Sequence, residues 1–392
     1  MSKASALLAP APLAPAGLAA VLLAAVLLAL DLYCTTAAAA AAGTAYAPVT
    51  AGQPLRFPDD LGSHPQFRTE WWYVTGWLAT ESGESLGFQI TFFRTKPDID
   101  ANNPSHFTPH QIIVAHCALS DPKRGTLWQD QRIRRAALGL AGALEGDTHV
   151  WIDQWSLQRT AQTYIAKIAA EDFSFDLAMS ETQAVLINGK EGVSRKGPQE
   201  RAASYYYSLP HMRVAGTISR KGASSRVTGE AWFDHEWSSE YLDAQAIGWD
   251  WIGINMQDGG ALMAFQIRAR DGKPRWAGGT IRSGDGTSQI LQPEDVEFRA
   301  GRRWTSPRTG IVYPVEWTIR ADGKRLRLVP LFDDQENDTR LSTGAIYWEG
   351  AVRAFDKLSE VGRGYLELTG YGEPLRLVRE GEKSQGTKPT VP

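Results

Sequence analysis

The chain has 392 residues, of which 43% are hydrophobic and 22% are charged, and its formal net charge is -3. This is the composition of a globular protein, which excludes a disordered or collagen-like chain. Because 41 basic side chains stand against 44 acidic ones, no basic surplus could neutralise a phosphate backbone, and nucleic acid is not an expected partner. The sequence also contains 14 Trp, 12 Tyr and 13 Phe but only 2 Cys.

The N-terminus is an uncharged, apolar segment. No charge occurs between Lys3 and Asp31, and residues 17–30 resemble the hydrophobic core of a signal peptide, followed by small residues that suit cleavage near Ala42. An uncleaved membrane anchor is the alternative, since the stretch approaches the roughly 20 residues of a spanning helix. We therefore expect residues 1–42 to be a signal peptide or anchor and the protein to be exported, either periplasmic or secreted.

From residue 50 onward the pattern is that of β-strands. Residues 70–79 and 86–95 predict a hairpin, and Phe88, Ile90 and Phe92 fall on one face of its second strand. Four Asp-Gly dipeptides, beginning at Asp258, Asp271, Asp285 and Asp322, mark turns of a later meander. The sequence predicts an all-β protein whose antiparallel strands close into barrels or sandwiches, which removes exposed strand edges.

The chain after the leader is long enough for two domains. We place them at residues 50–220 and 226–378, with the junction at the short stretch Ser219–Arg226, and we expect a disordered tail at residues 380–392. The segments Lys96–Pro109 and Asn188–Ala203 are predicted to be surface loops. Cys117, the cysteine that would remain after cleavage, lies in an apolar run, so it is expected to be a buried, inert thiol.

Signatures of several enzyme classes are absent from the sequence. It has no G-x-S-x-G, H-E-x-x-H, C-x-x-C or P-loop motif, which disfavours serine esterases, zincins and nucleotide-binding folds. The spacing of its histidines does not indicate a metal site. No metal and no cofactor are therefore expected.

Five clusters mix acidic and aromatic residues. Side chains two apart in a strand share a face, so Asp234 and Glu236 should project to one side and His235 and Trp237 to the other. Two carboxyl groups at close range should raise the pKa of one of them, through like-charge repulsion and burial. Packing is the alternative role for the aromatic residues, and a structural role stays open for the acids. The residues expected to line a substrate site are Trp71, Trp72, Tyr73, Trp237, Trp249, Trp251, Trp348 and Tyr365.

Five motifs together resemble one family. They are His64–Tyr73, Phe92–Arg94, Tyr206–Ser208, Phe233–Trp237 and Gly364–Tyr371. The chain is similar over about residues 50–378 to the AttH-like predicted secreted hydrolases. These are relatives of carotenoid 1,2-hydratase (hydroxyneurosporene synthase) and, more remotely, of kievitone hydratase and the lipocalin-like Diels-Alderases of fungi. The resemblance implies two lipocalin-like β-domains packed side by side.

The resemblance also implies cofactor-free chemistry on an apolar isoprenoid or lipid. In carotenoid hydratase an acid protonates a double bond and water captures the cation. Its His-x-Trp pair matches His235 and Trp237, but its Tyr-x-Asp should fall near residues 262–265, where the sequence reads Leu-Met-Ala-Phe. Asp250, between two tryptophans, is then the first candidate acid, and His235 would orient or activate water. Asp234, Glu236 and Glu349 are the other candidate acids.

The sequence thus favours a hydratase-like enzyme over two alternatives. One is a non-catalytic periplasmic lipid carrier, and the other is a secreted hydrolase, for which the sequence offers no nucleophile. The expected ligand is an apolar small molecule, membrane association would run through the N-terminal segment, and no protein partner can be inferred. If the enzyme hypothesis holds, Asp234, His235, Asp250 and Glu349 should converge on one cavity.

Overall fold

The computed structural model describes residues 46–99 and 108–374. Apart from Asp98 and Ile99, these residues belong to one structural unit, which holds all the strands described below. The predicted leader 1–42, the tail 380–392 and residues 100–107 of an expected loop lie outside the described residues. Within the described ranges, no helix is both long and apolar enough to cross a membrane.

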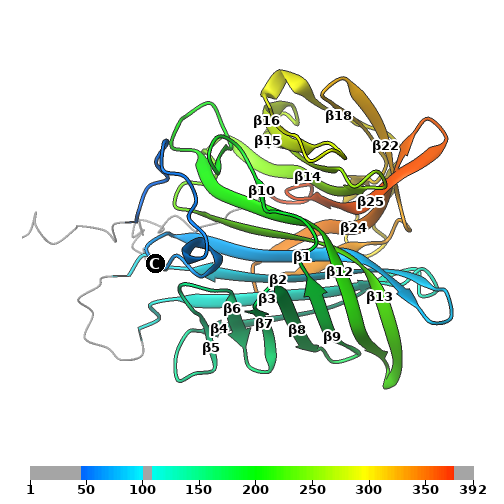
Figure 1. The fold of residues 1–392 in the computed structure, drawn as a ribbon, viewed down its shortest axis with the longest axis horizontal. Coiled ribbons are helices and arrows are strands. Elements are labelled where there is room, and N and C mark those ends of the chain that lie inside the picture. Colours follow the sequence, from blue (N-terminus) through cyan, green and yellow to red (C-terminus); the bar gives the residue numbers. More distant parts are fainter. Residues whose placement is uncertain (1–45, 100–107, 375–392) are drawn as a thin grey trace, which may run out of the picture. The chain divides into compact units, whose positions relative to one another are not determined.

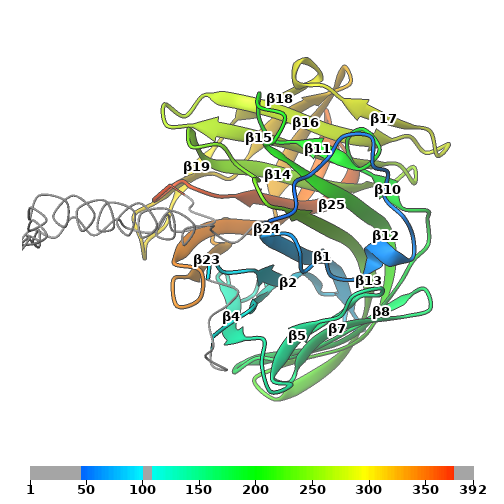
Figure 2. The same cartoon turned by 90° about the vertical axis from the view of Figure 1, so that its left-hand side faces the viewer.

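The first sheet is antiparallel and has 13 strands. Its order is β4-β3-β2-β1-β13-β12-β9-β8-β7-β6-β5, with β10 and β11 also paired to β12. The sheet curls until β3 and β4 approach β6, which gives the nearly closed barrel in the lower half of Figures 1 and 2. Its strands are β1 Thr69–Thr80, β2 Ser85–Thr95, β3 Ile112–Ser120, β4 Leu127–Arg135, β5 Ala141–Ala143, β6 His149–Ile152, β7 Trp155–Thr160, β8 Thr163–Ala169, β9 Phe173–Ser180, β10 Leu186–Ile187, β11 Val193–Arg195, β12 Ala203–Arg220 and β13 Ala223–Ser238.

The second sheet, also antiparallel, has 10 strands in the order β17-β16-β15-β14-β25-β24-β22-β21-β18, with β23 paired to β24. It curls until β18 approaches β15 and β16. Short 3-10 helices lie at Asp59–Leu61 and Pro293–Asp295, and β19 Arg303–Thr305 pairs with β20 Val312–Pro314 as a separate ribbon. The strands of the second sheet are β14 Ala246–Met256, β15 Ala261–Ala269, β16 Pro274–Arg282, β17 Ser288–Leu291, β18 Val296–Ala300, β21 Trp317–Ala321, β22 Lys324–Pro330, β23 Glu336–Thr339, β24 Ala345–Asp356 and β25 Ser359–Leu368.

The local sequence explains these elements. The predicted hairpin forms as β1 and β2, and Phe88, Ile90 and Phe92 are fully buried in the first barrel. The four Asp-Gly dipeptides lie at turns between β14 and β15, β15 and β16, β16 and β17, and β21 and β22, each with its glycine at positive φ. Cys117 is buried in the first barrel, as expected. The all-β prediction is confirmed.

Apolar side chains form three cores. One fills the first barrel, a second fills the curl of the second sheet, and a third lies between the two sheets. The third core lies where β1 and β13 of the first sheet meet β14, β24 and β25 of the second. It exists because these strands are buried on both faces. Each of these strands therefore directs alternate side chains into its own sheet's core and into the space between the sheets.

Two expectations about the middle of the chain were wrong. The stretch Ser219–Arg226 is the end of the β12–β13 hairpin, which turns at Lys221 and Gly222, and both strands belong to the first sheet. The chain passes to the second sheet only between Ser238 and Ala246. The expected loop 188–203 contains β11 and reaches into the interior, since Lys196 is buried. The division of the chain into two domains stays a prediction.

Candidate functional site

The side chains of the β13 motif Phe233–Trp237 project into two environments, as the alternation of side chains along a strand predicts. His235 and Trp237 point into the first barrel, where Trp237 joins the barrel core. Asp234 and Glu236 point to the other side, toward residues of the layer between the sheets. The structure therefore offers two clusters of ionisable groups rather than one.

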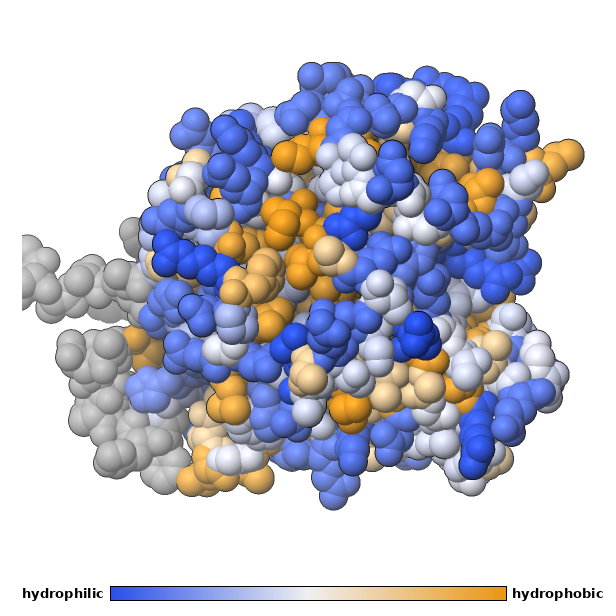
Figure 3. Space-filling view, viewed as in Figure 1, coloured by the Kyte–Doolittle hydropathy of each residue, from blue (hydrophilic) through white to orange (hydrophobic). Residues whose placement is uncertain are grey.

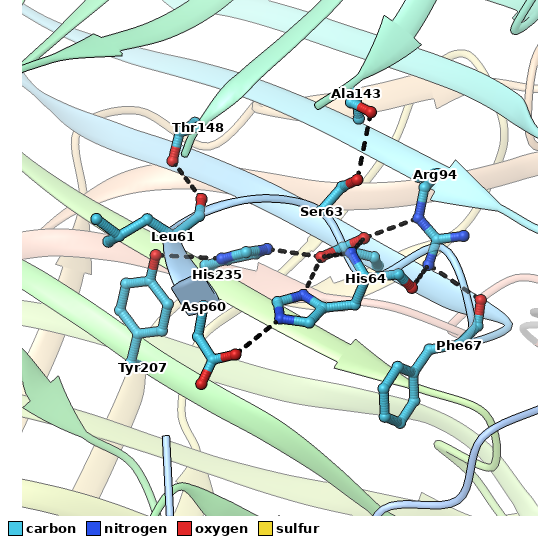
Figure 4. Close-up of polar contacts among 11 residues, drawn as sticks. Asp60, Leu61, Ser63, His64, Phe67, Arg94, Ala143, Thr148, Tyr207 and His235 are labelled. Atoms are coloured by element: carbon cyan, nitrogen blue, oxygen red, sulfur yellow. Dashed lines mark hydrogen bonds and ion pairs between the residues drawn. The ribbon is translucent and has the colours of Figure 1, made fainter. Parts of the chain in front are cut away.

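The barrel cluster, which we define as Asp60, His64, Glu70, Arg94 and His235, centres on Glu70. Figure 4 labels the other four residues of the cluster. Oε1 of Glu70 lies 2.7 Å from Nδ1 of His64 and 2.9 Å from Nε2 of His235. Arg94 donates from Nε to Oε2 of Glu70 at 2.7 Å. Glu70, Arg94 and His235 are fully buried. A buried carboxylate is thus shared by two imidazoles and a guanidinium.

Neighbouring groups hold both imidazoles in place. Nε2 of His64 lies 3.1 Å from Oδ1 of Asp60, and Nδ1 of His235 lies 3.1 Å from the Tyr207 hydroxyl. The His64 ring also stacks on Trp237, with centroids 3.7 Å apart. Because both nitrogens of His235 have partners within the barrel, this ring has no free nitrogen with which to activate water elsewhere.

The charges in the barrel cluster balance. Burial alone would raise the pKa of Glu70, but Arg94 and the two histidines hold it well below its ordinary value. Burial lowers the pKa of His64, yet hydrogen bonds to Asp60 and Glu70 outweigh it and raise that pKa, whereas burial dominates at His235 and lowers its pKa. Asp60 and Glu70 then carry negative charge against the positive charges of His64 and Arg94.

The same donors could in principle hold a metal ion. One ligand atom each from His64, Glu70 and His235 lie within 4.8 Å of one another. However, the Glu70 carboxylate already accepts from the Arg94 guanidinium, whose positive charge would repel a divalent cation. The barrel cluster is better described as an ion-pair network, and we assign no metal to it.

The acid cluster, which we define as Asp234, Glu236, Glu349 and Glu367, lies between the sheets. Glu349 on β24 and Glu367 on β25 are direct cross-strand partners, so their side chains leave the same face. Glu349 is buried, and its Oε1 has no hydrogen-bond partner among the described residues. Glu367 is partly exposed and accepts from Nε1 of Trp249 at 2.9 Å.

The other two acids are held by β12 and the 188–203 segment. Asp234 accepts hydrogen bonds from Ser208 at 2.5 Å, Tyr206 at 2.8 Å and Trp232 at 2.7 Å. Glu236 forms an ion pair with Lys196, with Nζ and Oε1 2.8 Å apart. Among the described residues, this is the one ion pair made by the acid cluster.

This arrangement raises the pKa of all four acids. Burial and the facing carboxyl of Glu367 raise the pKa of Glu349 well above its ordinary value. Burial raises the pKa of Asp234 and of Glu367 to about 7 and also raises that of Glu236, although Lys196 opposes the last shift. The cluster therefore holds at least one proton near neutral pH, as a general acid requires.

Aromatic side chains surround the acid cluster. Trp71, Tyr73, Trp249, Trp251 and Tyr365, all expected to line the site, belong to the core between the sheets. Trp71 and Trp249 are partly exposed, as is Glu367, so solvent reaches the cluster at this rim. In Figure 3 apolar atoms gather in the band between the two sheets.

The predicted convergence of Asp234, His235, Asp250 and Glu349 on one cavity was wrong. Asp250 points into the second sheet, where it is paired with Arg268 at 3.1 Å. His235 belongs to the barrel cluster. Of the four residues, only Asp234 and Glu349 therefore lie in the layer between the sheets. Of the predicted aromatic residues, Trp72 and Trp237 lie in the first barrel and Trp348 in the core of the second sheet.

Several residues of these clusters escaped prediction. Glu70, Arg94, Tyr206 and Glu367 lie within the motifs that carry the family resemblance, which is the signal that could have found them. Lys196 gave no signal, because its segment reads as a polar loop. Its burial depends on tertiary contacts with Glu236 and with the rings of Tyr206 and Phe265.

Comparison with known proteins places this architecture in a family. The model of the AttH-like family matches residues 48–371. The chain belongs to the AttH-like family. A crystal structure of an AttH candidate from Nitrosomonas europaea is 49% identical to this AttH-like chain, with a TM-score of 0.78, and the match covers 83% of this chain and 99% of that one.

Kievitone hydratase from Nectria haematococca shares the fold of this AttH-like protein. Its crystal structure is 15% identical with a TM-score of 0.62, and the match covers 84% of this chain and 96% of that one. This identity supports the fold alone, and it confirms the lipocalin-like architecture expected from the sequence. Among curated proteins, none matches the sequence.

Proposed function

We propose that this AttH-like protein is a cofactor-free general acid catalyst, hydratase-like or cyclase-like, that acts on an apolar unsaturated isoprenoid or lipid bound at the rim of the acid cluster. The observation that carries the proposal is the facing pair Glu349 and Glu367. Two carboxyl groups that leave the same face of neighbouring strands, one of them buried, cannot both ionise readily, so one keeps its proton at neutral pH.

The chemistry follows from this pair and its surroundings. A protonated carboxyl transfers its proton to one carbon of a double bond, and the adjacent carbon becomes a carbocation. The faces of Trp249 and Trp251 attract such a cation. Water then adds to the cation and returns a proton to the carboxylate, which regenerates the acid. The mechanism expected from the sequence fails, because Asp250 and His235 do not join the acid cluster. The proposal depends instead on Glu349 and Glu367, which take the role expected of Asp250, and His235 has no part in this step.

A serine hydrolase is less well supported. The hydroxyl Oγ of Ser342 does lie 2.9 Å from Nε2 of His116. However, burial lowers the pKa of His116 to about 3, which makes it a weak general base. The same Ser342 hydroxyl donates to Oε1 of Gln131, so it is committed to a structural contact. Export and the identity of the apolar substrate stay part of the proposal.

Substitution of the pair tests the proposal. With an acyclic isoprenoid that carries a terminal double bond, Glu349→Gln and Glu367→Gln should each lower kcat by about 10²- to 10⁴-fold, the usual contribution of a general acid. Glu360→Gln, on the same strand β25 but partly exposed and paired with Arg363, is the matched control and should keep full activity.

Unchanged turnover in both variants would remove the pair from the mechanism. The carrier alternative has its own readout, which is lipid that co-purifies with the wild-type protein and is identified by mass spectrometry. Retained lipid without any turnover by the wild type would favour a carrier over an enzyme.

A further inference from the structure

Exposed apolar residues concentrate at one place on the first barrel. Ile133, Leu138, Leu140 and Leu144 are four of the large apolar side chains that are exposed in the described residues. Ile133 lies on β4, Leu138 and Leu140 lie in the connection from β4 to β5, and Leu144 directly follows β5. Figure 3 shows apolar atoms at the lower left edge, where this connection lies in the same view of Figure 1. We call these four residues the β4–β5 patch.

The backbone presents the patch outward. Leu138 is 95% exposed and has a φ of 55°, in the left-handed region that leucine seldom adopts. A leucine in this conformation gains no packing from the rest of the described unit that could offset its strain. Beside it, Ile112, Ile133, Ala137 and Leu140 line a shallow pocket of about 420 Å³ together with Arg134 and Arg135.

Positive charges outnumber negative ones beside the patch: Arg134 and Arg135 line the pocket, and one exposed acid, Glu145, follows Leu144. Arg132 and Arg134 share one carboxylate, that of Asp153, at 3.7 Å and 3.0 Å. These three side chains therefore carry a net positive charge at the edge of an apolar surface. Apolar side chains beside arginines suit the interface of a membrane. The acyl chains there accept the apolar side chains, and the anionic headgroups attract the arginines.

We propose that the β4–β5 patch docks the first barrel on the surface of a membrane that contains anionic phospholipid, with Leu138 and Leu140 inserted at the headgroup boundary. This contact is separate from the predicted N-terminal segment and from the acid cluster. It would bring the barrel to the surface in which an apolar substrate is dissolved.

A fluorophore at the patch tests the proposal in the full chain. In a Cys34→Ser background, in which Cys117 is buried, Leu138→Cys is labelled with an environment-sensitive dye such as NBD. The matched control is Leu358→Cys, since Leu358 is 91% exposed at the turn between β24 and β25. Both proteins keep the N-terminal segment, so any effect of that segment is common to them.

We expect vesicles of phosphatidylcholine with phosphatidylglycerol to shift the emission of the dye at position 138 to the blue and to leave position 358 unchanged. Leu138→Ser should lower vesicle partitioning of the full chain by about tenfold, for the loss of one inserted leucine side chain. Leu358→Ser should not change it.

Three results would overturn the proposal. The first is a dye at position 138 that does not respond to these vesicles, and the second is an equal response at positions 138 and 358. The third is a blue shift at position 138 that is present without vesicles and disappears on dilution, because that would assign the patch to a contact with a second copy of the chain.

Discussion

Two buried glutamates of this protein have opposite electrostatic environments. Glu70 receives hydrogen bonds from Arg94 and from His64 and is held as an anion, with its pKa well below the ordinary value. Glu349 faces another carboxyl and has its pKa raised well above the ordinary value. The same residue type is therefore held as an anion in one cluster and is favoured in its protonated form in the other, as the proposed mechanism requires.

Removal of the Glu70 charge should destabilise the fold. Glu70→Gln leaves the Arg94 guanidinium buried without its counter-charge, and breaking a buried ion pair in this way costs about 3–5 kcal/mol. Urea unfolding measures the loss. Glu81→Gln, an exposed residue at the turn after β1, is the control and should change the free energy of unfolding by no more than about 0.5 kcal/mol.

The pH dependence of this stabilisation has a fixed sign. The folded pKa of Glu70 is depressed, so its contribution is complete above the unfolded value of 4.5 and is lost as the pH falls through the folded value. Equal unfolding midpoints for Glu70→Gln and the wild type at neutral pH would contradict the role assigned to the barrel cluster.

At the scale of elements, alternation along β13 was predictable from the sequence, but its surroundings were not. Because side chains alternate along a strand with a period of two, Asp234 and His235 project to opposite faces of the sheet. Which acids join Asp234 depends on the pairing of β24 with β25, residues 345–368, and on the sheet that β13 faces. Asp250 does not join the acid cluster for this reason, because its position on β14 points into the second sheet.

His211 links the two sheets through β12 and the β14–β15 turn. Nδ1 of His211 lies 2.6 Å from Oε1 of Glu230, and Nε2 lies 2.7 Å from the Gly260 carbonyl oxygen. Both partners are acceptors, so this geometry requires a proton on each nitrogen. Burial lowers the pKa of His211, but these two hydrogen bonds outweigh it and raise that pKa.

The link should weaken as the pH rises. Because the folded pKa of His211 is raised, its stabilising contribution is fully present below the unfolded value of 6.5 and is lost as the pH rises through the folded value. His211→Asn is a suitable variant, since asparagine tolerates the positive φ of 55° at this position.

Urea unfolding of both proteins between about pH 6 and pH 8 measures the effect, around the ordinary titration range of histidine. The wild type should be more stable than His211→Asn at the acidic end, and the difference should shrink toward the alkaline end. A difference that does not change with pH would show that His211 acts only by packing.

At the scale of the whole molecule, the fold class was predictable because strand periodicity and Asp-Gly turns are local signals. The position of the domain junction was not predictable, because a basic stretch such as Ser219–Arg226 is typical both of a linker and of a hairpin turn. The site depends on the least local feature of all, the third core between the sheets. Glu367 lies near Asp234 and Glu236 there only because two curled sheets pack face to face.

The central claim is that the pair Glu349 and Glu367 holds a proton at neutral pH. Carbon-13 NMR of side-chain carboxyl groups in glutamate-labelled protein, followed across a pH titration, tests it directly. We predict at least one glutamate carboxyl that stays protonated at neutral pH in the wild type and whose signal is lost in Glu349→Gln. If every glutamate carboxyl of the wild type is ionised at neutral pH, the pair Glu349 and Glu367 has no proton to donate and the proposed mechanism is wrong.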